Sequence, residues 1–365
     1  MPDLPVSIRL NPFKGPDGPD GAPVPWSPWG RILSGRPNFT LDPLFHAGCY
    51  YVQDSSAMFV GHLFRKYLPK LDFPRVLDLC AAPGGKTTDL AASLRERCGD
   101  AFELIANEVM AKRARVLADN VAAWGDANVK VCSVDPSVIG RELPGYFDVI
   151  VADVPCSGEG MFRKDPRAEA EWSPAVVELC AARQKRILAD VWPALREGGL
   201  LIYSTCTYED AENDANLRWA AETLGGEIIP PEDEFGAYGV RLTSCGSLLK
   251  AGEVPGEGQW AGALVKTVPS PGRPSAALSG ALPLMYPADA VRRSSNPSGV
   301  SEPPRVELTL EQAQRYLHRD SFPLPDAPLG MITVCYRGHP LGLAKNLGKR
   351  INNLYPKNRR ILMDV

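Results

Sequence analysis

Five short apolar runs alternate with helix-like stretches between residues 74 and 205, and this alternation constrains the fold more than any other feature. The apolar runs are Arg75–Leu79, Phe102–Ala106, Val129–Val134, Phe147–Ala152 and Leu200–Ser204. The helical patterns between them cover residues 86–97, 110–123 and 174–196. Strands that alternate with helices are typical of βαβ units, in which helices cover both faces of a parallel sheet. We therefore expect an α/β, doubly wound, Rossmann-like domain, which we place at residues 73–267.

A lead-in segment precedes this domain. Residues 1–45 are rich in proline and glycine and show few periodic apolar positions. The segment 53–68 has apolar residues at helical spacing, with Asp54 or Ser55 as its expected N-cap. We assign residues 1–72 to an N-terminal RNA-binding lead-in segment.

A small second domain is expected after a linker. Residues 268–304 are rich in proline, serine and glycine and are typical of a linker. Residues 305–365 regain an apolar pattern, with a helix expected to start at the cap Thr309 and a strand at Ile332–Tyr336. These elements predict a small α+β domain.

Composition excludes several classes of protein. No apolar run reaches the roughly 18 residues that a membrane span needs, and the first residues lack the pattern of a secretory signal. A cytoplasmic protein, by default a monomer, is therefore expected. The nine cysteines contain no C-x-x-C pair and the histidines number only four, so we expect free thiols and no metal.

The turn after the first strand of the predicted sheet has the composition of a ligand-binding loop. It comprises Cys80, Ala81, Ala82, Pro83, Gly84, Gly85 and Lys86, and a helix follows it. Small residues let the backbone approach a ligand, and a helix N-terminus offers free N–H groups. The turn matches neither the P-loop nor the G-x-G-x-x-G pattern.

Acidic residues end or follow the next three strands. These are Glu108, Asp135 and Asp153. Each alone can be a turn or helix-cap residue, and this alternative is strong for Asp135, which precedes a proline. Together they lie at the sheet edge where nucleotide ligands bind. We expect a cofactor with ribose and adenine, and S-adenosylmethionine suits a turn that does not wrap a triphosphate.

Two cysteines follow successive strands and are expected to face this cofactor. Cys156 lies in a Pro-Cys-Ser-Gly turn after the fourth strand, and Cys206 lies in a Thr-Cys-Thr turn after the fifth. A thiolate that adds to C6 of a pyrimidine activates C5 toward a methyl donor, and an acid such as Asp153 could interact with N3. The arrangement thus favours methylation of a pyrimidine at C5.

The C-terminal stretch is locally basic although the formal net charge of the chain is −3. Between Tyr336 and Arg360 there are seven Lys or Arg residues and no Asp or Glu. Such a stretch can be an ordinary solvated surface or a phosphate-binding patch. Tyr336 and Tyr355 could offer faces on which bases stack. We predict RNA contacts from Lys345, Lys349, Arg350, Tyr355 and Lys357.

These motifs resemble those of the Sun-type, RsmB/RsmF-like RNA cytosine-5 methyltransferases, and the resemblance extends over nearly the whole chain. The matching segments are DLCAAPGGKTT (78–88), NE (107–108), DVPCSGEGMFRKDP (153–166), RQKRIL (183–188) and STCTYEDAEND (204–214). Weaker matches are SIRLNPFK (7–14), YYVQDSSAM (50–58), PGEGQWAGALVK (255–266) and LGLAKNLGKRINNLYP (341–356).

The resemblance implies a role for each site residue. Cys206 corresponds to the nucleophile, Cys156 assists release of the methylated RNA, and Asp153 lies beside the target base. Cys80 to Lys86, Glu108, Asp135 and Asp153 correspond to contacts of S-adenosylmethionine. The tail resembles a PUA-like RNA-binding module of the RsmF branch, which favours ribosomal RNA of the small subunit.

Two departures and three alternatives accompany this interpretation. Val154 stands where the family usually has alanine, and the chain starts almost at the SIRLNPFK motif, so we expect a lead-in shorter than the family's. A transfer-RNA cytosine-5 methyltransferase and a non-catalytic RNA-binding scaffold remain alternatives. In a DNA cytosine methyltransferase, the third alternative, Cys156 would be the nucleophile.

Overall fold

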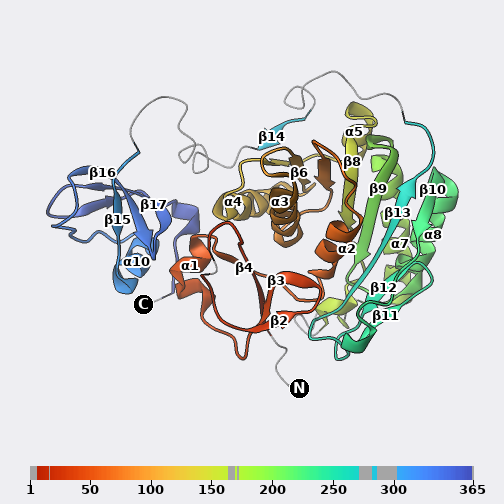
Figure 1. Cartoon of the computed structure of the whole chain (residues 1–365), viewed down its shortest axis with the longest axis horizontal. Helices are drawn as coiled ribbons and strands as arrows, with labels where there is room; N and C mark the ends of the chain where they lie inside the picture. The colour runs from red at the N-terminus through yellow and green to blue at the C-terminus, as the bar shows by residue number, and fades with distance from the viewer. Residues whose placement is uncertain are drawn as a thin grey trace.

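The computed structural model describes residues 6–15, 17–162, 169–170, 172–270, 282–285 and 302–363. Three sheets succeed one another along the chain: a four-stranded N-terminal sheet, a ten-stranded central sheet and a four-stranded C-terminal sheet (Figure 1). Most of the predicted linker 268–304 lies outside the described residues.

The central sheet carries the predicted parallel core. Its strand order is β11-β12-β13-β9-β8-β5-β6-β7-β14, and β10 also pairs with β13. The strands β5, β6, β7, β8 and β9 pair in parallel. They span Arg75–Asp78, Glu103–Asn107, Val129–Cys132, Phe147–Asp153 and Leu195–Thr205. The predicted doubly wound α/β fold is thus confirmed.

Helices cover both faces of this sheet. On one face lie α2 (Phe59–Tyr67), α3 (Gly85–Cys98) and α4 (Ala111–Trp124), and on the other α5 (Pro136–Glu142), α7 (Pro174–Val191) and α8 (Asp214–Trp219). Alternate residues of one strand point to opposite faces, so Val76 enters the first core and Leu77 the second. Both side chains are fully buried, as expected for a strand inside a covered parallel sheet.

The far edge of the central sheet is antiparallel. The long strand β13 (Gln259–Lys266) runs antiparallel to β9, and its other side pairs with β12 (Gly246–Leu249) and β10 (Gly226–Ile229). β11 (Val240–Leu242) pairs with β12, and β14 (Leu284–Met285) pairs with β7. The alternation in residues 74–205 did not reveal these strands.

The N-terminal segment differs from its prediction. Although residues 1–45 showed few periodic apolar positions, the segment forms an antiparallel sheet in the order β2-β3-β1-β4, followed by the helix α2. The strands are β1 (Ser7–Leu10), β2 (Ala22–Val24), β3 (Ser27–Ile32) and β4 (Tyr50–Val52), and the short helix α1 covers Pro43–His46. The expected helix 53–68 begins only at Phe59, because Asp54 instead organises a turn by accepting the N–H groups of Ser56 and Ala57.

The expected helix 174–196 ends early at Val191, where a 3-10 turn, Trp192–Ala194, replaces it. Pro193 lies in this turn, and proline cannot donate the hydrogen bond that a continuing helix requires. The turn leads directly into β9, which therefore starts five residues before the predicted strand.

The C-terminal domain combines the strands β15 (Arg305–Glu307), β16 (Gly330–Tyr336), β17 (His339–Asn346) and β18 (Ile351–Asn353) with α10 (Leu310–Leu317). As predicted, Thr309 caps α10, and a reciprocal capping box with Gln312 completes the cap.

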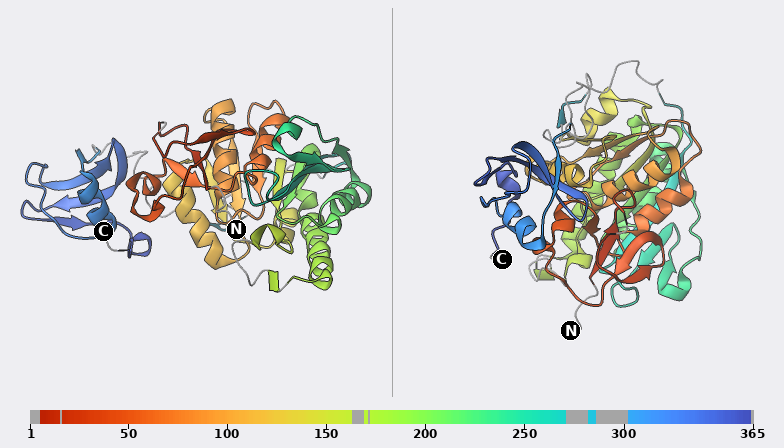
Figure 2. Two further views of the ribbon diagram at one scale, coloured as in Figure 1. Left: turned by 90° about the horizontal axis from the view of Figure 1, so that it is seen from below. Right: turned by 60° about the vertical axis from the view of Figure 1, so that its left-hand side comes forward.

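This domain packs against the N-terminal sheet and α1 at one end of the molecule (Figure 2). Gln314 donates to the Leu41 carbonyl oxygen at 3.0 Å, and His339 lies 3.0 Å from Asp17. The two ends of the chain thereby share one apolar core.

A buried arginine joins the N-terminal sheet to the central domain. Arg9 is fully buried and donates to Gln53 Oε1 at 2.8 Å and to the Gly85 carbonyl oxygen at 3.0 Å. Its guanidinium also lies over the Trp124 ring, 4.6 Å from the centroid. Gly85 starts α3, so this side chain connects β1 directly with the turn of small residues.

We expect Arg9→Met to lower the free energy of unfolding by about 3 kcal/mol, because it leaves buried acceptors without their donor. Chemical denaturation measures this loss. Arg31→Met, which changes a partly exposed arginine of the same sheet, is the control and should change stability by less than about 1 kcal/mol. Equal stability of the Arg9→Met variant and the unmodified chain would contradict the prediction.

Candidate active site

The turn of small residues links β5 to α3, and neighbouring elements hold its carbonyl groups. Tyr51 and Asn120 both donate to the Pro83 carbonyl oxygen, at 3.1 and 2.8 Å. Arg113 donates to that of Ala82 at 2.9 Å. These contacts hold the backbone of the turn in place at the start of α3, where the first N–H groups of a helix have no partner within the helix.

Two features of this turn fit the predicted cofactor. Gly84 has a φ of +115°, which favours glycine, and a Cβ there would approach Leu117 Cδ1 to 3.2 Å. Asp78, at the end of β5, binds Thr87 through Oδ2 at 2.6 Å, but its buried Oδ1 has no hydrogen-bond partner among the described residues. A turn that excludes side chains beside an unsatisfied carboxylate suits a ligand with an amino group, such as S-adenosylmethionine.

The acidic residues after the next strands have different surroundings. Glu108 is buried, accepts the Met110 N–H at 2.9 Å and lies 3.1 Å from Arg113. Asp135 caps α5 by accepting the Ser137 N–H at 3.0 Å, and it also accepts the Ser137 hydroxyl at 2.7 Å. The hydroxyl contact, with the N–H contact, lowers the pKa of its carboxyl. The helix-cap role that the sequence left open for Asp135 is therefore present.

Asp153 ends β8 and is held by three donors. Its Oδ1 accepts Ser204 Oγ at 2.7 Å and Gln259 Nε2 at 3.1 Å, and its Oδ2 lies 2.8 Å from Lys86 Nζ. Lys86 belongs to the first turn of α3, so this ion pair joins the turn of small residues to the end of β8. Ser204 and Gln259 were not singled out from the sequence, although both lie in quoted motifs.

The two predicted cysteines meet at the ends of β8 and β9. Cys156 Sγ lies 3.0 Å from Cys206 Sγ and accepts the Cys206 N–H at 3.3 Å. Both cysteines are free. The structure therefore brings together the two loops that the sequence placed at neighbouring strand ends.

The two thiols have opposite electrostatic properties. A hydrogen bond from Cys156 lowers the pKa of Cys206, and the positive charge of nearby Lys86 lowers it further. The same contact, with burial, raises the pKa of Cys156 well above its ordinary value. Cys206 is thus the thiol that ionises first, and Cys156 retains its proton.

The residues predicted to contact RNA differ in their exposure to solvent. Lys345, Lys349, Arg350 and Lys357 are exposed. Tyr355 is not: only 2% of it is exposed, and its ring packs edge-on against Tyr316 with centroids 5.5 Å apart. The prediction that Tyr355 offers a face for stacking is wrong, because the ring belongs to the core of the C-terminal domain.

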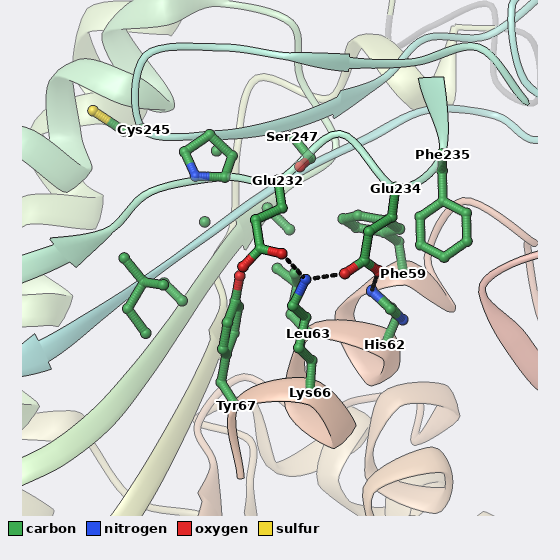
Figure 3. Close-up of a pocket in the computed structure, with 16 residues that line it drawn as sticks. Phe59, His62, Leu63, Lys66, Tyr67, Glu232, Glu234, Phe235, Cys245 and Ser247 are labelled. Carbon is green, nitrogen blue, oxygen red and sulfur yellow. Dashed lines mark hydrogen bonds and ion pairs between the residues drawn. The ribbon is translucent and has the colours of Figure 1, made fainter. Parts of the chain in front are cut away.

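A separate hollow between α2 and the antiparallel edge of the central sheet is lined by none of the predicted site residues (Figure 3). Lys66 lies 2.9 Å from Glu232 and also pairs with Glu234, which in turn lies 3.2 Å from His62. These ion pairs satisfy the charges of the hollow internally, so we do not place the active site there.

Within the described ranges, no group of three or more His, Cys, Asp or Glu side chains could hold a metal ion. No helix in the same part of the chain is long and apolar enough to span a membrane.

The fold and the loops at the strand ends define a Rossmann-like methyltransferase. A solved structure titled as a methyltransferase homologue from Pyrococcus horikoshii is 27% identical, with a TM-score of 0.59 over 72% of this chain and 87% of that one. The structure of NSun6 from the same organism with SFG is 23% identical, with a TM-score of 0.53 over 64% of this chain and 57% of that one, and shows the fold alone.

Three family descriptions divide the chain between them. Residues 2–55 match the N-terminal domain of 16S rRNA methyltransferase RsmF, residues 68–223 match 16S rRNA methyltransferase RsmB/F, and residues 303–361 match the methyltransferase RsmF PUA domain.

Curated relatives match along nearly the whole chain. Ribosomal RNA small subunit methyltransferase F of Klebsiella pneumoniae (strain 342) is 33% identical, and that of Escherichia coli (strain E24377A) is 31% identical. Each similarity covers 96% of this chain and 89% of the relative. The chain belongs to the RsmF family of methyltransferases.

Burial of Asp78 predicts a pH dependence of stability. It raises the pKa of this carboxyl from 3.8 to about 7, so between these values the folded protein holds a proton that the unfolded chain has released. The free energy of unfolding should therefore fall as pH rises from about 4 to about 7. Asp78→Asn should flatten this slope in denaturation measurements, whereas Asp72→Asn, at an exposed position, should leave it unchanged. An unchanged slope in Asp78→Asn would contradict the prediction.

Proposed function

We propose that this protein methylates C5 of a cytosine in ribosomal RNA of the small subunit, with S-adenosylmethionine as the methyl donor. The observation that carries the proposal is the contact between Cys206 and Cys156 beside the Lys86–Asp153 ion pair. The names of the relatives support ribosomal RNA as the substrate. The NSun6 structure with SFG, an analogue of S-adenosylmethionine, supports the cofactor.

The proposed cofactor site comprises the turn Cys80–Lys86 with Glu108, Asp135 and Asp153. The buried Glu108 carboxylate has the position after β6 at which an acid usually accepts ribose hydroxyls. S-adenosylmethionine, when bound, supplies an electrophilic methyl group.

In the proposed reaction, the Cys206 thiolate forms a bond to C6 of the cytosine, which makes C5 nucleophilic. Lys86 favours both the thiolate and the negative charge that builds on the ring, while Asp153, held by its donors, orients the base. C5 then forms a bond to the methyl carbon while the bond between that carbon and the sulfonium sulfur of the donor breaks, which leaves the donor as a neutral thioether. When the C5 proton passes to water, the C5–C6 double bond re-forms, the C6–S bond breaks and Cys206 leaves as a thiolate.

The structure offers a reason why Cys156 would assist release. Its sulfur lies 3.0 Å from that of Cys206, and its raised pKa keeps it protonated. A thiol that donates a hydrogen bond to the departing thiolate stabilises that leaving group. In the alternative in which Cys156 is the nucleophile, as in a DNA cytosine methyltransferase, the order of the two pKa values would have to be reversed.

Transfer of labelled methyl groups from S-adenosylmethionine to RNA of a host that lacks its own enzyme tests the reaction. We expect transfer by the unmodified chain, none by Cys206→Ala, and a covalent protein–RNA adduct that accumulates in Cys156→Ala. Retained transfer in Cys206→Ala would overturn the assignment of the nucleophile. RNA binding without transfer by the unmodified chain would favour the scaffold, and label in transfer RNA would favour that substrate.

We propose that the exposed basic residues of the C-terminal domain bind RNA phosphates. In a plot of log affinity against log salt concentration, affinity falls as salt rises. Replacing Lys345, Lys349 and Lys357 with alanine should make this slope shallower by about 2 to 3, because each lost phosphate contact removes about 0.7 to 0.9 from its steepness. Filter binding over a salt series measures this slope. Lys70→Ala, at an exposed position after α2, is the control and should keep the original slope. The same slope in the triple variant would place the RNA elsewhere.

A further inference from the structure

The loop that carries Cys156 has no regular secondary structure between Val154 and Gly158. Its position therefore depends on hydrogen bonds to neighbouring elements. The N–H of Val154 donates to the Ser204 carbonyl oxygen at 3.1 Å, which fixes the start of the loop on β9. Beyond that point the backbone groups of Pro155 and Ser157 contact α7 and the segment after Cys206.

One pair of buried side chains holds the backbone on both sides of Cys156. Before the cysteine, the carbonyl oxygen of Pro155 accepts Gln184 Nε2 at 3.0 Å. After it, the N–H of Ser157 donates to Glu212 Oε2 at 3.1 Å. Gln184 and Glu212 also contact each other, with Gln184 Nε2 2.6 Å from Glu212 Oε2. The amide and the carboxylate thus bind the two peptide groups that flank the thiol.

A second layer of contacts fixes the orientation of this pair. Gln184 Oε1 accepts a hydrogen bond from Asn216 at 2.7 Å, so its amide nitrogen faces Pro155 and Glu212. The Tyr203 hydroxyl lies 2.6 Å from the Glu212 carbonyl oxygen and 3.0 Å from Gln184 Oε1, and its one proton goes to the nearer of these two acceptors. Gln184, Glu212, Tyr203 and Asn216 are all fully buried.

The charge of Glu212 also acts on Cys156, in addition to the hydrogen bond that holds its loop. A buried carboxylate near Cys156 disfavours the thiolate form of that cysteine, and Glu212 is among the groups that raise its pKa. Glu212 itself lies in the 3-10 turn Asp210–Glu212 that follows the Cys206 loop. Glu212, in the segment that follows Cys206, therefore holds the loop that carries Cys156.

We propose that Glu212 and Gln184 are positioning residues that hold the Cys156 thiol against Cys206, and so control release of the methylated RNA rather than formation of the adduct. This inference rests on the proposed function, because it assigns the pair to one step of that reaction. Neither residue belongs to the turn of small residues, so cofactor binding is an independent measure of folding.

The test compares Glu212→Gln with Cys156→Ala and with Glu103→Gln. Glu103 is the matched control, since it is a buried carboxylate of β6 that binds Lys130 and Tyr146 instead of the cysteine loops. Gln184→Met, which removes the donor to Pro155, is the second variant. Each variant is assayed for adduct on denaturing gels, for single-turnover methyl transfer and for affinity for S-adenosylmethionine.

We expect release to slow by about tenfold to a hundredfold in Glu212→Gln and Gln184→Met, because small displacements of a reacting group cost rates of this order. Both variants should accumulate adduct as Cys156→Ala does, with unchanged affinity for the cofactor. Glu103→Gln should accumulate none.

Adduct in Cys156→Ala but in neither Glu212→Gln nor Gln184→Met would overturn this inference and leave the proposed function intact. Loss of adduct formation and of cofactor affinity together would show that the pair has a purely structural role, which also overturns it. Absence of adduct in Cys156→Ala itself would instead overturn the covalent reaction on which the inference rests.

Discussion

The structure depends on one buried cation, Arg9, which the N-terminal sheet inserts beside α3 and α4. Its guanidinium binds Gln53, the carbonyl of Gly85 and the face of Trp124. Burying a charge is costly unless hydrogen bonds compensate it, so the surrounding elements can assemble only in an arrangement that supplies these acceptors. Because Gly85 starts α3, the same contact fixes the turn that we propose for the cofactor. The N-terminal sheet is therefore part of the site and not a separate appendage.

From that turn a continuous series of polar contacts extends to the cysteines. Lys86 pairs with Asp153, and Asp153 accepts a hydrogen bond from Ser204, two residues before Cys206. Glu159 then accepts from Thr207 at 2.7 Å, which ties the loop after Cys156 to the loop after Cys206. The ends of β5, β8 and β9 are thus connected by an ion pair and by hydrogen bonds between side chains. This explains how two loops without regular secondary structure can present sulfur atoms at a fixed separation.

The sequence predicted the parallel core and the positions of the two cysteines, because alternating strands and helices leave a strong local pattern and both cysteines follow strands directly. It did not predict the N-terminal sheet, whose short strands contain Pro23 and Pro28 and are stabilised by partners distant in the chain. It also failed for Tyr355, since its burial depends on Tyr316 in α10 and on α1. The roles of Gln184 and Glu212 arise only when α7 and the Cys206 segment meet at one loop, a relation that no local pattern encodes.

The shared core of the N-terminal sheet and the C-terminal domain has a consequence for synthesis. Ile8 and Tyr50 enter the same apolar cluster as Leu317 and Ile351, so part of the surface of the first strands is covered only by the last 60 or so residues. A ribosome makes the N-terminus first, and the apolar side of that sheet must wait for almost the whole chain before its cover exists. The two cores on either side of the central sheet draw on residues 24–285 and not on the C-terminal domain, so they have no such requirement. Final closure of this core therefore follows synthesis of the C-terminal domain.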